Sequence, residues 1–195
     1  MADLSGEIVE ICRLLYDRRL TDSAGGNVSA RDGGTVLVSP RYTGTRYRGR
    51  ITRDSIVRVA LDGAVLSGAG EPSREIGIHL RLYREFAGAG AVIHAHPQYT
   101  MVFASAGRPI PSAVEYADGF GTVQPVVWGE AHSDELARNV AAKMKEIRGT
   151  VSEPACCVLI PRHGVVAMGA DLSAAYDAVE RVETSARCNI LSKLL

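Results

Sequence analysis

The sequence predicts a single α/β layered domain, residues 1–195, organised around a mixed or antiparallel central sheet. Three observations support this prediction. Helical and strand-like patterns alternate along the whole chain. Neither an internal repeat nor a low-complexity linker divides the chain. A length of 195 residues with 46% hydrophobic content is enough for one hydrophobic core.

Helices are expected where hydrophobic residues recur every three or four positions. Leu4, Ile8 and Leu15 show this spacing in the first of them. Ser133 and Asp171 are suitable capping residues at the starts of two others. The expected helices, in chain order, cover about residues 3–19, 71–86, 99–106, 133–147 and 171–194.

Strands are expected where short apolar or alternating runs lie between turn residues. The runs before and after His163 predict a hairpin. Pro125 interrupts another run, which suggests an edge strand because proline has no N–H group to offer to a neighbour. The expected strands cover about residues 35–38, 55–61, 91–96, 122–128, 156–160 and 165–168.

The composition favours a cytoplasmic protein that acts on small molecules. Lys plus Arg equals Asp plus Glu, which argues against a nucleic-acid or membrane-surface partner. No apolar run is as long as a membrane span, and the N-terminus has an amphipathic pattern instead of a signal peptide. Cys12, Cys156, Cys157 and Cys188 lack zinc-motif spacing and are expected to be reduced, buried thiols.

His94 and His96 end a small apolar run and are followed by Pro97. Side chains two residues apart on a strand point to the same face, so the two imidazoles are expected to lie close together. Imidazole binds zinc, iron, copper or nickel, and catalytic zinc sites usually have three protein ligands. The pair alone is also compatible with a structural histidine beside an unrelated one.

Two loops carry groups that can bind an anion. Residues 23–30 combine paired glycines with Asn27 and Ser29, which permits close approach of the backbone to a ligand. Residues 41–53 are rich in arginine and contain glycine. From these residues alone, the first loop can equally be a plain turn. The arginines of the second loop can equally be solvated or contact another subunit.

A third candidate site lies at the start of the helix expected over 71–86. Pro72 and Ser73 are typical of a helix start, where free N–H groups can bind an anion. Glu75 is expected in the first helical turn, where the helix dipole favours its charge. A dipole-compensating surface residue is the alternative interpretation of Glu75. His79 would lie one turn later on the same face.

Four motifs in this order closely resemble the class II aldolase/adducin family, and the resemblance covers nearly the whole chain. They are Gly25-Gly26-Asn27-Val28-Ser29, Pro72-Ser73-Arg74-Glu75, His94-Ala95-His96-Pro97 and His163-Gly164.

The resemblance implies a three-layer α/β/α sandwich with a mostly antiparallel central sheet. It also implies a homotetramer with active sites between subunits. His94, His96 and His163 correspond to the zinc ligands, and Glu75 to the catalytic acid/base. Tyr116 resembles a proton donor that reaches the site from a neighbouring subunit. Gly26, Asn27, Thr43, Gly44 and Ser73 match the positions that hold the substrate phosphate.

The sequence departs from the aldolase pattern at three places, all of which concern substrate recognition. Arg74 stands where the sugar-phosphate aldolases have a second serine, and we expect it to bind a phosphate or a carboxylate. The loop over 39–53 is longer by about three residues, which affects the match at Thr43 and Gly44. The sequence ends at Leu195, so the C-terminal tail that closes the site in longer relatives is expected to be absent.

We therefore expect a zinc-dependent aldolase, a carbon–carbon lyase, that cleaves a ketose phosphate or a related hydroxy-keto acid through a metal-stabilised enediolate. Iron(II), manganese(II) or cobalt(II) are alternatives to zinc. The same scaffold supports epimerases, dehydratases, decarboxylases and oxygenases, and Asp118 resembles a catalytic aspartate of the epimerases. An adducin-like assembly module without metal is less consistent with three retained histidines and Glu75.

Overall fold

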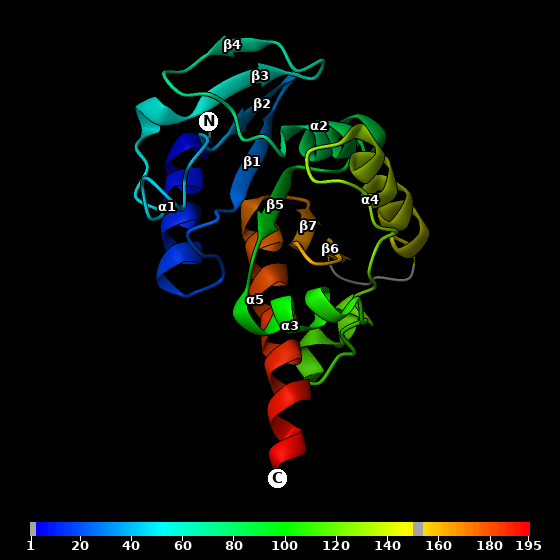
Figure 1. The fold of residues 1–195 in the computed structure, drawn as a ribbon. Coiled ribbons are helices and arrows are strands. Elements are labelled where there is room, and N and C mark those ends of the chain that lie inside the picture. The colour runs from blue at the N-terminus through cyan, green and yellow to red at the C-terminus, as the bar shows by residue number, and fades with distance from the viewer. Residues whose placement is uncertain (1–2, 150–153) are drawn as a thin grey trace.

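The computed structural model describes residues 3–149 and 154–195, and these form helices around a central sheet (Figure 1). The helices are α1 (Leu4–Asp17), α2 (Ile76–Glu85), α3 (Gln98–Ala106), α4 (Asp134–Ile147) and α5 (Leu172–Leu191). The strands are β1 (Asn27–Asp32), β2 (Thr35–Val38), β3 (Val57–Ala60), β4 (Val65–Ser67), β5 (Ala91–Ala95), β6 (Ala155–Ile160) and β7 (Gly164–Gly169). Short 3₁₀ turns cover Arg53–Ser55, Glu115–Phe120 and Ser192–Leu194.

Seven strands of the described residues form one sheet in the order β4-β3-β2-β1-β5-β7-β6, and each pairs with its neighbours in antiparallel fashion. The central pairing joins β1 to β5, which are separated by three strands and a helix in the sequence, and places Asn27 opposite His94. The hairpin predicted around His163 is formed by β6 and β7. This sheet with its flanking helices confirms the predicted α/β sandwich.

Alternating residues of the strands belong to two hydrophobic cores, one on each face of the sheet. Helices α1 and α5 cover one face, where Ile93 packs, and α2 and α4 cover the other, where Val92 packs. His94 follows Val92 by two residues and therefore lies on the face of the sheet covered by α2 and α4. This register directs the histidine toward the start of α2.

The helix predicted over 71–86 begins later than expected, at Ile76. Residues 71 and 72 are held in an extended conformation instead. The N–H of Arg41 donates to the carbonyl of Glu71 at 2.8 Å, and Pro40 forms a bridge with Pro72. Glu75 consequently occupies the capping position before the helix and is not part of its first turn.

The prediction of a strand over 122–128 is wrong, because this segment forms only isolated bridges. Val123 pairs with Ile110, and Pro125 pairs with Leu159 at the outer side of β6. Proline supplies no N–H, which limits the ladder that this segment can form.

Strand β4 has no counterpart among the predictions, since all three of its residues are exposed and lack the alternation of a half-buried strand.

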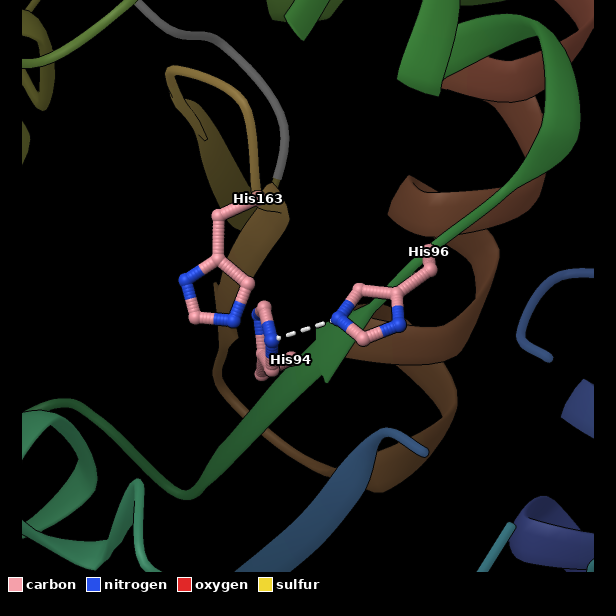
Figure 2. A group of neighbouring side chains, drawn as sticks. All are labelled: His94, His96 and His163. Carbon is pink, nitrogen blue, oxygen red and sulfur yellow. Dashed lines mark hydrogen bonds between the residues drawn. The ribbon is translucent and has the colours of Figure 1, made fainter. Parts of the chain in front are cut away.

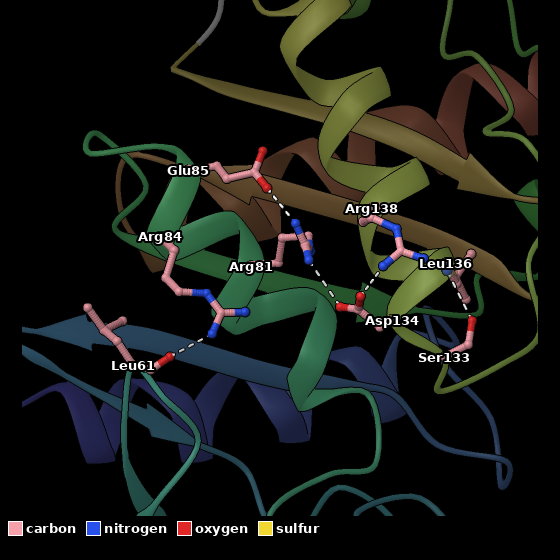
Figure 3. A network of polar contacts seen from close by, with 8 residues as sticks. All are labelled: Leu61, Arg81, Arg84, Glu85, Ser133, Asp134, Leu136 and Arg138. Carbon is pink, nitrogen blue, oxygen red and sulfur yellow. Dashed lines mark hydrogen bonds and ion pairs between the residues drawn. The ribbon is translucent and has the colours of Figure 1, made fainter.

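Helices α2 and α4 are joined by a polar network at the surface (Figure 3). Arg81 of α2 donates to Glu85 at 2.8 Å and to Asp134, the first residue of α4, at 3.0 Å. Arg138 also contacts Asp134, while the preceding Ser133 accepts the N–H of Leu136 at 3.0 Å. Exposed ion pairs contribute little stability. These contacts instead hold the first residue of α4 beside α2.

A buried polar cluster lies between β1 and α2, behind the start of the helix. The Ser29 hydroxyl lies 2.7 Å from Nδ1 of His79 and 2.8 Å from the hydroxyl of Tyr83. Burial lowers the pKa of His79 to about 3, so this imidazole is neutral at physiological pH. His79 is therefore part of the core and not of the cavity that contains Glu75.

All four cysteines are free thiols, as expected. Cys12, Cys156 and Cys157 are buried, whereas Cys188 on α5 is only partly buried, contrary to the prediction. No helix in the described part of the chain is long and apolar enough to cross a membrane.

Candidate active site

A cavity of about 540 Å³ opens where the start of β1, the end of β5, the start of α2 and the β6–β7 turn meet. Most of the residues predicted to form a site line this cavity. They are Gly26, Asn27, Thr43, Ser73, Arg74, Glu75, His94, His96 and His163.

The three histidines converge on one point (Figure 2). His94 lies in β5, His96 follows the end of that strand, and His163 comes from the β6–β7 turn. The Nε2 atoms of His94 and His96 are 3.0 Å apart, and one nitrogen from each of the three rings lies within 4.8 Å of the others. This group could hold a metal ion.

The hydrogen bonds of two rings fix which nitrogen is free to bind. Nδ1–H of His94 donates to the carbonyl of Val165 at 3.0 Å, and Nδ1–H of His96 donates to the Asp22 carboxylate at 3.1 Å. The neutral form of each ring then carries its free lone pair on Nε2, and the two Nε2 atoms lie within hydrogen-bond distance of each other. A cation between them would accept both lone pairs, so the donor set fits a divalent metal.

Burial keeps at least two of the imidazoles in the form that binds metal. The pKa of His94 lies well below its usual value, first because the ring is buried and then because other histidines are near. Burial lowers the pKa of His163 to about 4 in the same way. A histidine binds a metal through its neutral imidazole, so both rings are in the form that can act as ligands.

Two glycines allow the backbone to come close to this cluster. A Cβ atom at Gly164 would lie 2.4 Å from the carbonyl oxygen of Ala95 and 2.8 Å from Cδ2 of His96. A Cβ atom at Gly26 would lie 2.9 Å from the carbonyl oxygen of His94. Any side chain at either position would push on the segment that carries the first two histidines.

Glu75 lies beside the histidines with only 4% of its surface exposed. Its Oε1 atom contacts Nδ1 of His132 and is 4.0 Å from Nε2 of His163. Burial raises the pKa of Glu75, and the adjacent His132 partly offsets that rise. A buried carboxyl group with a raised pKa is suited to exchange protons.

His132 was not among the residues singled out from the sequence. It precedes Ser133, the N-cap of α4, and its backbone has a φ of 68°. The small number of histidines could have pointed to it, because four of the five in the chain line the cavity and only His79 does not. Nothing local in the sequence around His132 predicts a contact with a residue 57 positions away.

The residues expected to bind an anion form one wall of the cavity. The amide oxygen of Asn27 is buried and has no hydrogen-bond partner among the described residues. Ser73 accepts the N–H of Glu75 at 3.3 Å, and Thr43 donates to the carbonyl of Pro40 at 2.7 Å. Gly44 does not line the cavity but packs beneath it, where a Cβ atom would be 2.8 Å from the Cα of Gly25.

Arginines contribute positive charge to the cavity. Arg74 lies near Glu75 and favours its charged form. Arg74 lines the cavity but is exposed, and the nearby Glu71 pairs with Arg41 at 3.0 Å. Arg162 also lines the cavity, next to His163, and was not predicted.

Tyr116 does not line the cavity of its own chain. It lies in the 3₁₀ turn Glu115–Phe120 with 55% of its surface exposed, which excludes a place in the core of the monomer. Its carbonyl accepts a hydrogen bond of 2.7 Å from Arg181 on α5. Asp118 is exposed in the same turn and binds Ser112 at 2.7 Å, outside the cavity.

This fold, with a three-histidine group and a buried carboxylate at the ends of the central strands, is that of a class II aldolase. The chain belongs to the class II aldolase and adducin family, because the model of the class II aldolase and adducin N-terminal domain matches residues 6–190. The predicted family and the predicted aldolase type of enzyme are thereby confirmed.

Individual relatives resemble the chain over nearly its full length. It is 31% identical over 193 residues to an L-fuculose phosphate aldolase of Methanocaldococcus jannaschii, with 97% of each chain covered. It is 29% identical to a 3-oxo-tetronate 4-phosphate decarboxylase of Haemophilus influenzae, covering 96% of this chain and 88% of that protein. A solved structure of L-fuculose 1-phosphate aldolase superposes with a TM-score of 0.85 at 29% identity, covering 100% of this chain and 88% of that one.

Proposed function

We propose that this protein is a zinc-dependent aldolase that cleaves a phosphorylated ketose, with His94, His96 and His163 as the metal ligands. The observation that carries the proposal is the convergence of three imidazole nitrogens beside the buried carboxylate of Glu75. The named aldolase relatives support a sugar phosphate as substrate. In this proposal residues 1–195 act as one catalytic domain in the cytoplasm.

Each group has a distinct role in the proposed reaction. Zinc, when bound, supplies a positive charge that polarises a substrate carbonyl and stabilises the negative charge that develops on cleavage. Glu75 takes up and returns the proton. Asn27, Ser73 and Arg74 bind the phosphate, while Gly26, Thr43 and Gly44 shape the backbone around it.

A phosphorylated sugar acid is the second candidate substrate, with decarboxylation as the corresponding reaction. Arg162, which lines the cavity beside His163, could bind a carboxylate. The relative named 3-oxo-tetronate 4-phosphate decarboxylase supports this alternative. The epimerase alternative has less support, because the relatives named above are aldolases and a decarboxylase.

The proposal is tested by metal analysis of the purified protein together with a retro-aldol assay on a panel of ketose phosphates. We expect zinc in an amount equimolar with the chain, and cleavage of a ketose 1-phosphate to dihydroxyacetone phosphate and an aldehyde. A chelator should abolish this activity and added zinc should restore it. Release of carbon dioxide from a 3-oxo acid phosphate, with no cleavage of ketose phosphates, would replace the aldolase proposal by the decarboxylase one.

We further propose that the protein is a homotetramer in which Tyr116 of one subunit completes the site of the next as proton donor. The exposure of Tyr116 and its absence from its own cavity support this arrangement. Mixing inactive Tyr116→Phe with inactive Glu75→Gln subunits should restore part of the activity, since some interfaces then pair an intact tyrosine with an intact glutamate. Light scattering should give a mass near four chains. Mixed oligomers with proven subunit exchange and no recovery would contradict a shared site.

A further inference from the structure

The carboxylate of Glu75 depends on a single neighbour. Both of its oxygens are buried, and apart from the contact with Nδ1 of His132 neither has a hydrogen-bond partner among the described residues. The next basic group, Nε2 of His163, is 4.0 Å away. A buried carboxylate without a partner costs several kcal/mol, so the contact with His132 determines where this group rests.

The backbone at His132 is held in an unfavourable conformation that serves this contact. A φ of 68° lies in the left-handed region, which costs a residue other than glycine roughly 1 kcal/mol. The next residues are fixed, because Ser133 caps α4 and Asp134 is bound to Arg81 of α2. The turn before α4 therefore directs the imidazole toward the residue that precedes α2.

We propose that His132 is a positioning residue for Glu75. Its Nδ1 holds Oε1 of the carboxylate beside the histidine group and leaves Oε2 to exchange the proton with the substrate. This proposal rests on the proposed function of Glu75 as acid/base. It adds a residue from a second element, so that the positions of both α2 and α4 determine the geometry of proton transfer.

Substitution of His132 by glycine separates this role from a structural one. Glycine adopts a φ of 68° without strain, so a fall in the unfolding midpoint would reflect the unpaired Glu75 carboxylate and not the backbone at position 132. Turnover should fall about 100-fold because the carboxylate is no longer held in place, while KM and zinc content remain near their wild-type values. Imidazole added to this variant should restore part of the turnover. His132→Asn, which tolerates the same backbone and keeps an N–H donor, should retain more activity than the glycine variant.

Arg19→Gly is the matched control. Arg19 is exposed outside the cavity and has a φ of 58°, so this change also replaces a left-handed residue by glycine but should not alter turnover. Unchanged turnover in His132→Gly would overturn the proposal.

A second measurement does not depend on activity. In a crystal structure of His132→Gly, the Glu75 carboxylate should leave its wild-type position, and an unmoved carboxylate would also overturn the proposal. If the wild-type protein cleaves no member of the substrate panel, the proposed function fails, but the position of Glu75 still decides whether His132 holds it.

Discussion

Replacing Glu75 with glutamine is expected to lower the turnover of carbon–carbon bond cleavage by about two to four orders of magnitude, the usual scale of acid–base catalysis. The amide has nearly the same shape as the carboxyl group but cannot accept and return a proton. Because Glu75 is not one of the three proposed metal ligands, the zinc content should remain at the wild-type level. The measurements are steady-state kinetics and metal analysis on the same preparation.

Glu7→Gln provides the control for this substitution. Glu7 is an exposed glutamate on α1, outside the cavity, so the same chemical change there should leave both turnover and metal content unaltered. An active Glu75→Gln enzyme would rule out the acid/base role. Loss of zinc from that variant would instead indicate that Glu75 mainly binds metal.

The parts of the site that lie on strands or directly beside a strand end could be predicted from the sequence. Alternation along a strand was enough to place His94 and His96 together, and the β6–β7 hairpin was recognisable from the runs on either side of His163. Capping residues at Ser133 and Asp171 correctly marked two helix starts.

The remaining features depend on contacts between distant segments, which local patterns do not encode. Whether Glu75 begins the helix or precedes it is decided by the bridge between Pro40 and Pro72. The contact between His132 and Glu75 depends on the packing of α4 against α2, which share a hydrophobic core and the Arg81–Asp134 pair. The motif that resembles the aldolases identified Glu75, but nothing in it includes the residue that holds this carboxylate.

The geometry of the three-histidine group requires glycine at position 164. An alanine Cβ atom there would lie 2.4 Å from the carbonyl oxygen of Ala95, 2.8 Å from Cδ2 of His96 and 3.1 Å from Cε1 of His94. The first of these neighbours is backbone and cannot rotate away, so β5 and β7 must separate at this end. Because β5 carries His94 and leads into His96, the ligand geometry must change with it.

Gly164→Ala is therefore expected to weaken zinc binding about 10- to 100-fold, the scale found when groups that orient metal ligands are altered. The overpacking should also lower the free energy of unfolding by about 1–3 kcal/mol. Zinc affinity is measured by competition with a chelator, and stability by denaturant unfolding of the metal-free protein.

Gly77→Ala is the control, since a Cβ atom at Gly77 meets nothing within 4 Å and alanine favours the helix there. Turnover of Gly164→Ala should recover in part at high zinc concentration, because the ligands are displaced and not removed. Zinc affinity equal to that of Gly77→Ala would show that the strand ends can move apart without disturbing the histidines, and that the close approach at Gly164 serves only the packing of the sheet.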